Sequence, residues 1–267
     1  DVSFPALASL AVYATTRVLV DNGFDGPVIV PFLIAAGLGA LLGAFNGIFT
    51  SRLTVPTLII TLGTANVFNG FMQGALKSVQ INTIPSSMQS FGQASLFVAQ
   101  NRASGLQSAM PVSFLLLVAV VAAAFFLTRY TMFGRGILAI GGDEAAAARA
   151  GFSVAGTKFW LYVIVGVIAA MAGMVRTCSM GQMHPTNLLG MEMMVIAAVV
   201  LGGTAITGGK GSLTGVMLGT LLIVIVQNSM ILTGIPTIWQ NFALGLLIIV
   251  GTGISAVQVA RSRGRTA

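Results

Sequence analysis

Long stretches without a single charged residue constrain this chain more than any other feature. Asp, Glu, Lys and Arg are all missing from 53–76, 103–128, 159–175 and 211–260. Only 7% of the 267 residues are charged, whereas a soluble domain carries roughly 25%. About 20 apolar residues cross a bilayer as a helix, so the last stretch alone has room for two crossings. The chain is therefore predicted to be all-α, a polytopic transmembrane helical bundle.

Cutting the sequence at glycine, proline and charged residues gives nine candidate crossings. The segment 84–99 is polar, so a short re-entrant or surface helix is expected there instead of a full crossing. About eight spans remain. They are expected at 5–20, 28–49, 55–74, 111–128, 159–177, 192–208, 213–232 and 238–258.

The basic residues orient these spans. If Asp1 lies inside, eight crossings return the C-terminus to the cytoplasm. Nine basic residues then face the cytoplasm and Arg17, Lys77, Arg102 and Arg176 face outward, as the positive-inside rule requires. The nine are Arg52, Arg129, Arg135, Arg149, Lys158, Lys210, Arg261, Arg263 and Arg265. Because they are scattered singly and form no stripe, the net charge of +7 does not indicate nucleic-acid binding.

Small residues recur at three- or four-residue spacing in GLGALLGAFNG (37–47) and GSLTGVMLGT (211–220). Membrane helices use such faces to approach one another closely. Close helix packing is the favoured interpretation, and lining of a transport pathway is the alternative.

The segment 129–158 is the one sizeable cytoplasmic loop on this topology. A short helix is expected at 143–150, with Asp143 capping its start and Glu144 at the positive end of its dipole. Arg149 suits the last turn, and Gly151 is a natural stop. A helix this short needs a partner to be stable. Its smooth alanine face therefore favours docking into a groove on another protein, and a passive connector is the alternative.

Several segments of the sequence, this loop among them, resemble a known family of proteins. FGR at 133–135, AIGGDEAAAARAGFSV at 139–154 and Lys158 resemble the cytoplasmic coupling loop of ABC-transporter permeases of the ribose/simple-sugar type. NGIFTSRLTVPTLIITLGT (46–64) and the long stretch 185–222, with its paired glycines and Lys210, are similar to the same family. Phe4-Pro5 and Met194 depart from its pattern, which leaves the solute open.

The resemblance implies a membrane-spanning permease subunit of an ATP-driven importer in a bacterial inner membrane. It implies one permease domain over 1–267, ten spans in a full-length member, and therefore a chain that begins inside a longer one. The implied partners are a cytoplasmic ATP-binding subunit, an extracytoplasmic solute-binding protein, a second identical or different permease, and lipid. ATP and Mg would be bound by the partner, with no cofactor, metal or catalytic site on this chain. The residues implied to couple to the ATP-binding subunit are Gly141, Asp143, Glu144, Ala145, Ala146, Arg149 and Gly151.

Uncharged amides and hydroxyls are the candidates for a sugar path, because they exchange hydrogen bonds with a neutral polyol without burying charge. Glu192 is added because it is the one acid within or beside a span. The alternative, given equal weight, is that Glu192 only lies at the outer mouth and has no role in the path. For each polar residue, hydrogen bonding between helices is the competing interpretation. The candidates are Asn46, Thr61, Thr64, Asn66, Asn69, Gln73, Glu192 and Asn228, with Gln240 and Asn241 as further members.

Other functions are weighed against this one. GGTAITGGKGS (202–212) lacks the Walker A spacing, so a tight turn is expected there instead of a nucleotide site. A permease for branched-chain amino acids or nucleosides would share the loop. An ion-coupled secondary transporter, from a different class, would show inverted repeats and buried ion sites, which are not evident in the sequence.

Overall fold

The structure is a computed structural model. It describes residues 1–100, 107–205, 208–236, 238–240, 242, 243, 245–247, 249, 251 and 253. The chain divides into two compact units. The first comprises Asp1–Gly134 and Ser153–Leu189, and the second comprises Arg135–Phe152 and the chain from Gly190 onward.

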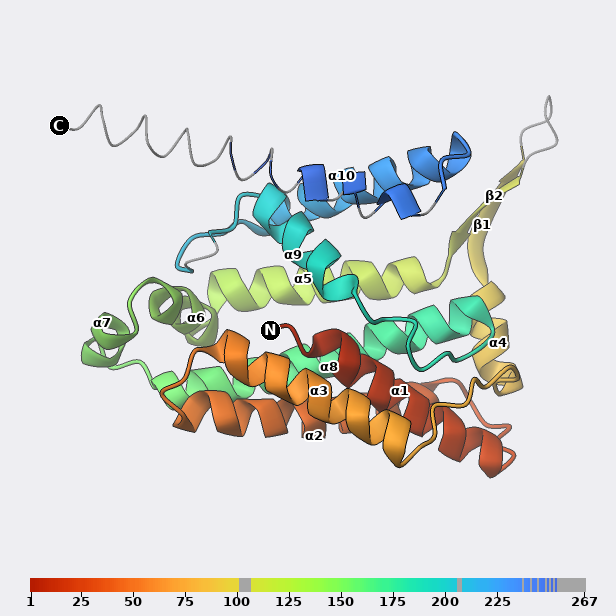
Figure 1. The fold of residues 1–267 in the computed structure, drawn as a ribbon, viewed down its shortest axis with the longest axis horizontal. Coiled ribbons are helices and arrows are strands. Elements are labelled where there is room, and N and C mark those ends of the chain that lie inside the picture. The colour runs from red at the N-terminus through yellow and green to blue at the C-terminus, as the bar shows by residue number, and fades with distance from the viewer. Residues whose placement is uncertain are drawn as a thin grey trace. The chain divides into compact units, whose positions relative to one another are not determined.

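The first unit is a helical bundle with a small sheet. Its helices α2 and α8 run alongside each other, and α1 packs on both (Figure 1). Its elements are α1 (Phe4–Asp21), α2 (Ile29–Arg52), α3 (Thr57–Gly74), α4 (Ser86–Gln93), β1 (Ser95–Gln100), β2 (Gln107–Pro111), α5 (Ser113–Tyr130) and α8 (Val154–Met180).

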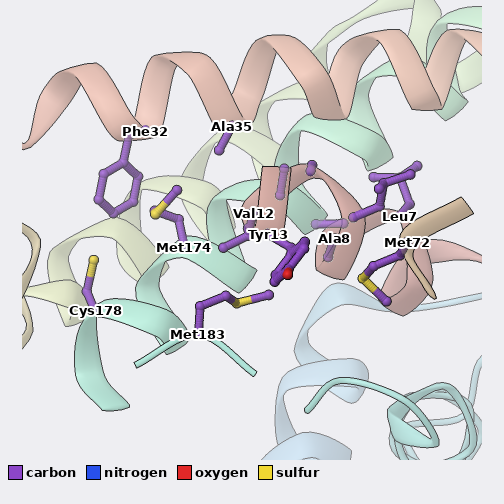
Figure 2. Packing of buried hydrophobic residues seen from close by; sticks show 14 of the residues in the cluster. Leu7, Ala8, Val12, Tyr13, Phe32, Ala35, Met72, Met174, Cys178 and Met183 are labelled. Carbon is purple, nitrogen blue, oxygen red and sulfur yellow. The ribbon is translucent and has the colours of Figure 1, made fainter. Parts of the chain in front are cut away.

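The core of this unit is centred on α1. Tyr13 is 1% exposed, and its hydroxyl donates to the carbonyls of Leu76 and Val79 at 3.2 and 3.0 Å. Side chains of α2, α3 and α8, among them Phe32, Met72 and Met174, form one buried cluster with those of α1 (Figure 2). An α1 buried on nearly all sides fits a helix inside a bundle, not one facing lipid.

Glycines bring α2 and α8 into backbone contact. A Cβ added at Gly43 would lie 3.1 Å from the carbonyl carbon of Tyr162, and one at Gly47 would lie 2.8 Å from the oxygen of Phe159. One turn earlier, Gly39 meets the backbone of Gly166. The packing interpretation of the stretch 37–47 is therefore confirmed.

The expectation of an all-α fold missed one element. The strands β1 and β2 pair antiparallel, with Val98 opposite Ala109. The segment 84–99, which was discounted as a crossing, holds the eight-residue α4 and then β1. The polar run was correctly excluded as a span, but its end SLFVAQ alternates too weakly to distinguish a strand from a helix.

The second unit contains α6 (Met132–Gly142, from Arg135 onward), α7 (Glu144–Arg149), α9 (Met191–Leu201) and α10 (Leu213–Leu232). Glycines again allow the close approach. A Cβ at Gly219 would lie 2.9 Å from the nitrogen of Gly202, and one at Gly202 would meet the backbone of Gly215. The packing interpretation of the stretch 211–220 is confirmed as well.

Four helices of the described chain are long and apolar enough to cross a membrane: α2, α5, α8 and α10. The predicted crossing at 192–208 is too long, because α9 ends at Leu201 where Gly202 and Gly203 follow. Eleven residues rise about 16 Å, whereas the hydrocarbon core is about 30 Å thick. The total of eight crossings stays a prediction. Arg102, about half of the last span and the C-terminal arginines lie outside the described residues.

Candidate functional site

The predicted cytoplasmic loop begins at a tight corner after α5. The hydroxyl of Thr131 donates to the carbonyl of Leu127 at 2.6 Å and accepts from the nitrogen of Gly134 at 3.0 Å. A Cβ at Gly134 would lie 2.5 Å from the Cα of Thr128, so a glycine is required at this corner. The corner fixes where α6 begins.

One short helix was predicted in this loop, but the structure has two, α6 and α7. A signal was available. Phe133, Ile137 and Ile140 are apolar at positions i, i+4 and i+7, which is the spacing of one helical face.

The second helix, α7, starts as predicted. Asp143 is its N-cap, and its carboxylate accepts from the nitrogen of Ala146 at 2.8 Å. Glu144 lies in the first turn, where a negative charge favours the helix dipole, and Arg149 lies in the last turn, where a positive charge does. The two neighbouring acids are therefore explained by how a six-residue helix is started.

The end of α7 is also as predicted. Gly151 has a φ of +88°, in the left-handed region that favours glycine. Its nitrogen donates to the carbonyl of Ala148 at 3.0 Å, and the nitrogen of Phe152 donates to that of Ala147 at 3.1 Å. These bonds satisfy carbonyls that the helix leaves free at its end.

The alanines of α7 divide between two faces. Ala147 is 4% exposed and turned inward, whereas Ala145, Ala146 and Ala148 are exposed. The helix thus presents small side chains outward, with a charged residue at each end. This is the geometry of a surface element that can enter a groove, and the partner it would enter stays a prediction.

Three of the predicted path residues lie buried between helices. Asn46 of α2 is fully buried, and its Nδ2 donates to the hydroxyl of Ser3 at 2.7 Å. The hydroxyl of Thr61 in α3 accepts from the nitrogen of Val2 at 3.2 Å. Thr64 is also buried and donates to the carbonyl of Thr61 at 3.2 Å. These contacts join α2 and α3 to the segment just before α1, which favours a structural role for Asn46 and Thr61 over a path role. The path role stays a prediction.

The other three path candidates on α3 are differently placed. Asn66 and Gln73 are exposed, and the Nδ2 of Asn66 donates within its own helix to the carbonyl of Leu62 at 3.1 Å. Asn69 is half-buried, and its Oδ1 is enclosed without a hydrogen-bond partner among the described residues. The structure therefore separates the exposed amides from the buried group formed by Thr61 and Thr64.

The remaining four candidates belong to the second unit. Gln240 is half-buried, and Asn241 lies outside the described residues. Glu192 lies half-buried in the first turn of α9, where the helix dipole stabilises an acid. Asn228 is exposed on α10. Its neighbour Gln227 donates through Nε2 to the sulfur of Met194 at 3.0 Å, a contact between α9 and α10 that the sequence did not indicate.

The comparisons with known proteins decide the family. The family described as "Branched-chain amino acid transport system / permease component" matches residues 2–251. The chain belongs to this permease family. The resemblance to ABC-transporter permeases that the loop and the 185–222 stretch carry is thereby confirmed.

Three relatives share the name autoinducer 2 import system permease protein LsrC. The protein from Enterobacter sp. (strain 638) is 33% identical over 93% of this chain, and that from Yersinia enterocolitica is 30% identical over 93%. The protein from Klebsiella pneumoniae is 32% identical over 79% of this chain. The chain spans 68%, 65% and 58% of the lengths of these relatives, respectively. No solved structure matches.

Proposed function

We propose that this family member is the membrane-spanning permease subunit of an ATP-binding-cassette importer in a bacterial inner membrane. The observation that carries the proposal is α7: a capped, glycine-terminated helix with an exposed alanine face between two charges. A partner that moves this helix can act on the membrane helices joined to it. Family membership and four helices with the length and apolarity of membrane spans support the same function.

ATP hydrolysis is assigned to a separate subunit. The paired glycines and Lys210 do not have the spacing of a phosphate-binding loop. Gly208 and Gly209 both have positive φ and make a compact turn. ATP and Mg would then be bound by the partner, and this chain would supply the docking surface of α7. A solute-binding protein outside and a second permease subunit complete the proposed complex.

The solute is proposed to be a simple sugar or a similar uncharged polyol. The candidate path residues on α3 are amides and hydroxyls, which suit a neutral solute. Autoinducer 2, which appears in the names of the relatives, is the first solute to test. The family description names branched-chain amino acids, so leucine is the second.

The docking role of α7 is tested by enlarging its exposed face. We expect Ala146→Trp to abolish co-purification of the co-expressed ATP-binding subunit, because an indole cannot enter a groove shaped for a methyl group. The matched control is Ala75→Trp, which makes the same change at an exposed alanine after α3, outside the loop. The amount of subunit retained on the tagged chain, after purification in detergent, is the measurement.

Equal retention by both variants would contradict the docking role and favour a passive connector. A chain that retains no ATP-binding subunit even when unmodified would instead favour the ion-coupled secondary transporter. The thermal unfolding midpoint of each variant shows whether the substitution has disturbed the chain itself.

A further inference from the structure

The loop that carries α7 packs with a part of the chain far from it in sequence. Arg135–Phe152 forms one compact unit with the chain from Gly190 onward, whereas α5 before it and α8 after it belong to the other unit. The loop is thus joined covalently to one unit and packed into the other. Such an arrangement determines which helices follow the loop when it moves.

Glycine backbone atoms lie close together where the loop packs in this unit. A Cβ added at Gly141, at the end of α6, would lie 2.9 Å from the nitrogen of Gly209. One added at Gly208 would lie 3.3 Å from the Cα of Gly141 and closer still to its carbonyl. Without side chains to change rotamer, a displacement on one side is passed directly to the other.

The segment that receives the contact is a closed turn. The nitrogen of Ala205 donates to the carbonyl of Lys210 at 2.9 Å, and the nitrogen of Gly208 donates to that of Ala205 at 3.0 Å. Gly208 and Gly209 have φ values of +88° and +74°, which residues other than glycine adopt only with strain. These two hydrogen bonds join Ala205 to Gly208 and Lys210, which are the described residues on either side of 206 and 207.

The turn connects α9 to α10, and these helices are themselves in backbone contact. A Cβ at Gly215 would meet the carbonyl of Gly202, and one at Gly219 would meet that of Ala198. Ser212 caps α10 by accepting from the nitrogen of Gly215 at 3.3 Å. A push on the turn consequently displaces both helices together.

We propose that the contact of Gly141 with Gly208 and Gly209 transmits the movement of α7 to α9 and α10. The inference rests on the proposed function, because it needs an ATP-binding subunit to move α7. It assigns these glycines a positioning role. It also explains why the paired glycines resemble a nucleotide loop without its spacing: their close packing serves the coupling loop.

The test compares two neighbouring glycines of α6. Gly141→Ala places a methyl group against the backbone of Gly209, whereas a Cβ on Gly142 would lie 3.9 Å from the Cα of Gly209, an ordinary van der Waals distance. Gly142→Ala is therefore the matched control. Both are made with Met193→Cys, at an α9 position that is 59% exposed, to report movement of that helix. The native Cys178 is buried, and any labelling of it is measured as background in the same variants without Met193→Cys.

The probe is the rate of N-ethylmaleimide labelling, in the complex with the ATP-binding subunit, with and without ATP plus vanadate. We expect the nucleotide to change the rate in Gly142→Ala and the change to be lost in Gly141→Ala, with both variants retaining the subunit. If Gly141 had only a structural role, Gly141→Ala would alter the labelling rate measured without nucleotide but would leave the change caused by nucleotide intact. An equal response in both variants would overturn the inference and leave the proposed function standing.

A second measurement needs no substitution at the contact. Binding of the ATP-binding subunit is expected to slow amide hydrogen exchange at 208–210 and in the first turn of α10, as well as in α7. Slowing in α7 alone would overturn the inference while supporting the proposed function. If the unmodified chain does not bind the ATP-binding subunit, the inference and the proposed function are both contradicted.

Discussion

Replacing Gly43 by leucine is expected to destabilise the first unit by about 3 kcal/mol or more, because the side chain has no room between α2 and α8. The Cβ alone would lie 3.1 Å from the carbonyl carbon of Tyr162 and from the Cα of Val163. These are backbone atoms of a helix, so they cannot rotate away. The two helices would have to separate, and the contacts at Gly39 and Gly47 would loosen with them.

The matched control for this substitution lies on the same helix. Gly37 is exposed, and no atom of the part of the chain that the structure describes lies within 4 Å of the Cβ that a side chain would add. Gly37→Leu is therefore expected to leave stability unchanged or raise it slightly, since glycine costs about 1 kcal/mol inside a helix. Thermal unfolding in detergent measures both variants. Equal unfolding midpoints would contradict the account of how α2 and α8 pack.

Replacing Asn46 by leucine is expected to cost about 2 to 3 kcal/mol, from a lost buried hydrogen bond and from overpacking. Its Nδ2 donates to the hydroxyl of Ser3 at 2.7 Å, and that hydroxyl in turn donates to the carboxylate of Asp1 at 2.7 Å. This chain of bonds ties the segment before α1 to α2. A branched apolar side chain supplies no donor there.

The control is the same substitution at Asn66, which is exposed and bonds only to a carbonyl of its own helix in the described structure. Asn66→Leu is expected to shift stability by no more than about 0.5 kcal/mol. If Asn46→Leu leaves the unfolding midpoint unchanged but abolishes uptake, the interhelical role of Asn46 is wrong and the path role gains. Loss of uptake with Asn66→Leu alone would locate the path on the exposed side of α3.

Much of the helical framework follows from the sequence, because uncharged apolar runs have few other ways to fold in a membrane. The predicted span 213–232 coincides with α10, and 28–49 falls short of α2 by three residues at its end. The prediction for α8 began at 159, after Lys158, but the helix starts at Val154. A single charge does not break a helix, so cutting at charged residues shortened this one.

The parts of the structure that were not predicted correctly were missed for different reasons. The apolar run after Glu192 continues to Leu201, and nothing in its hydropathy reveals that Gly202 and Gly203 end α9 so early. In the site, the cap at Asp143 and the stop at Gly151 could be predicted because both are local backbone chemistry. The contact of Gly141 with Gly209 could not, since it joins residues far apart in sequence through atoms common to all amino acids.

An ATP-binding partner is proposed to drive this permease. This proposal is tested most directly by reconstituting the full-length protein in vesicles with its ATP-binding subunit and solute-binding protein. Uptake of autoinducer 2, and of leucine in parallel, is measured with ATP, without ATP, and with an imposed proton or sodium gradient alone.

We expect uptake to require ATP and the ATP-binding subunit, and ATP hydrolysis to rise when the solute-loaded binding protein is added. Which of the two solutes is taken up decides between a polyol and an amino acid. Uptake driven by the ion gradient in vesicles that lack the ATP-binding subunit would contradict the account.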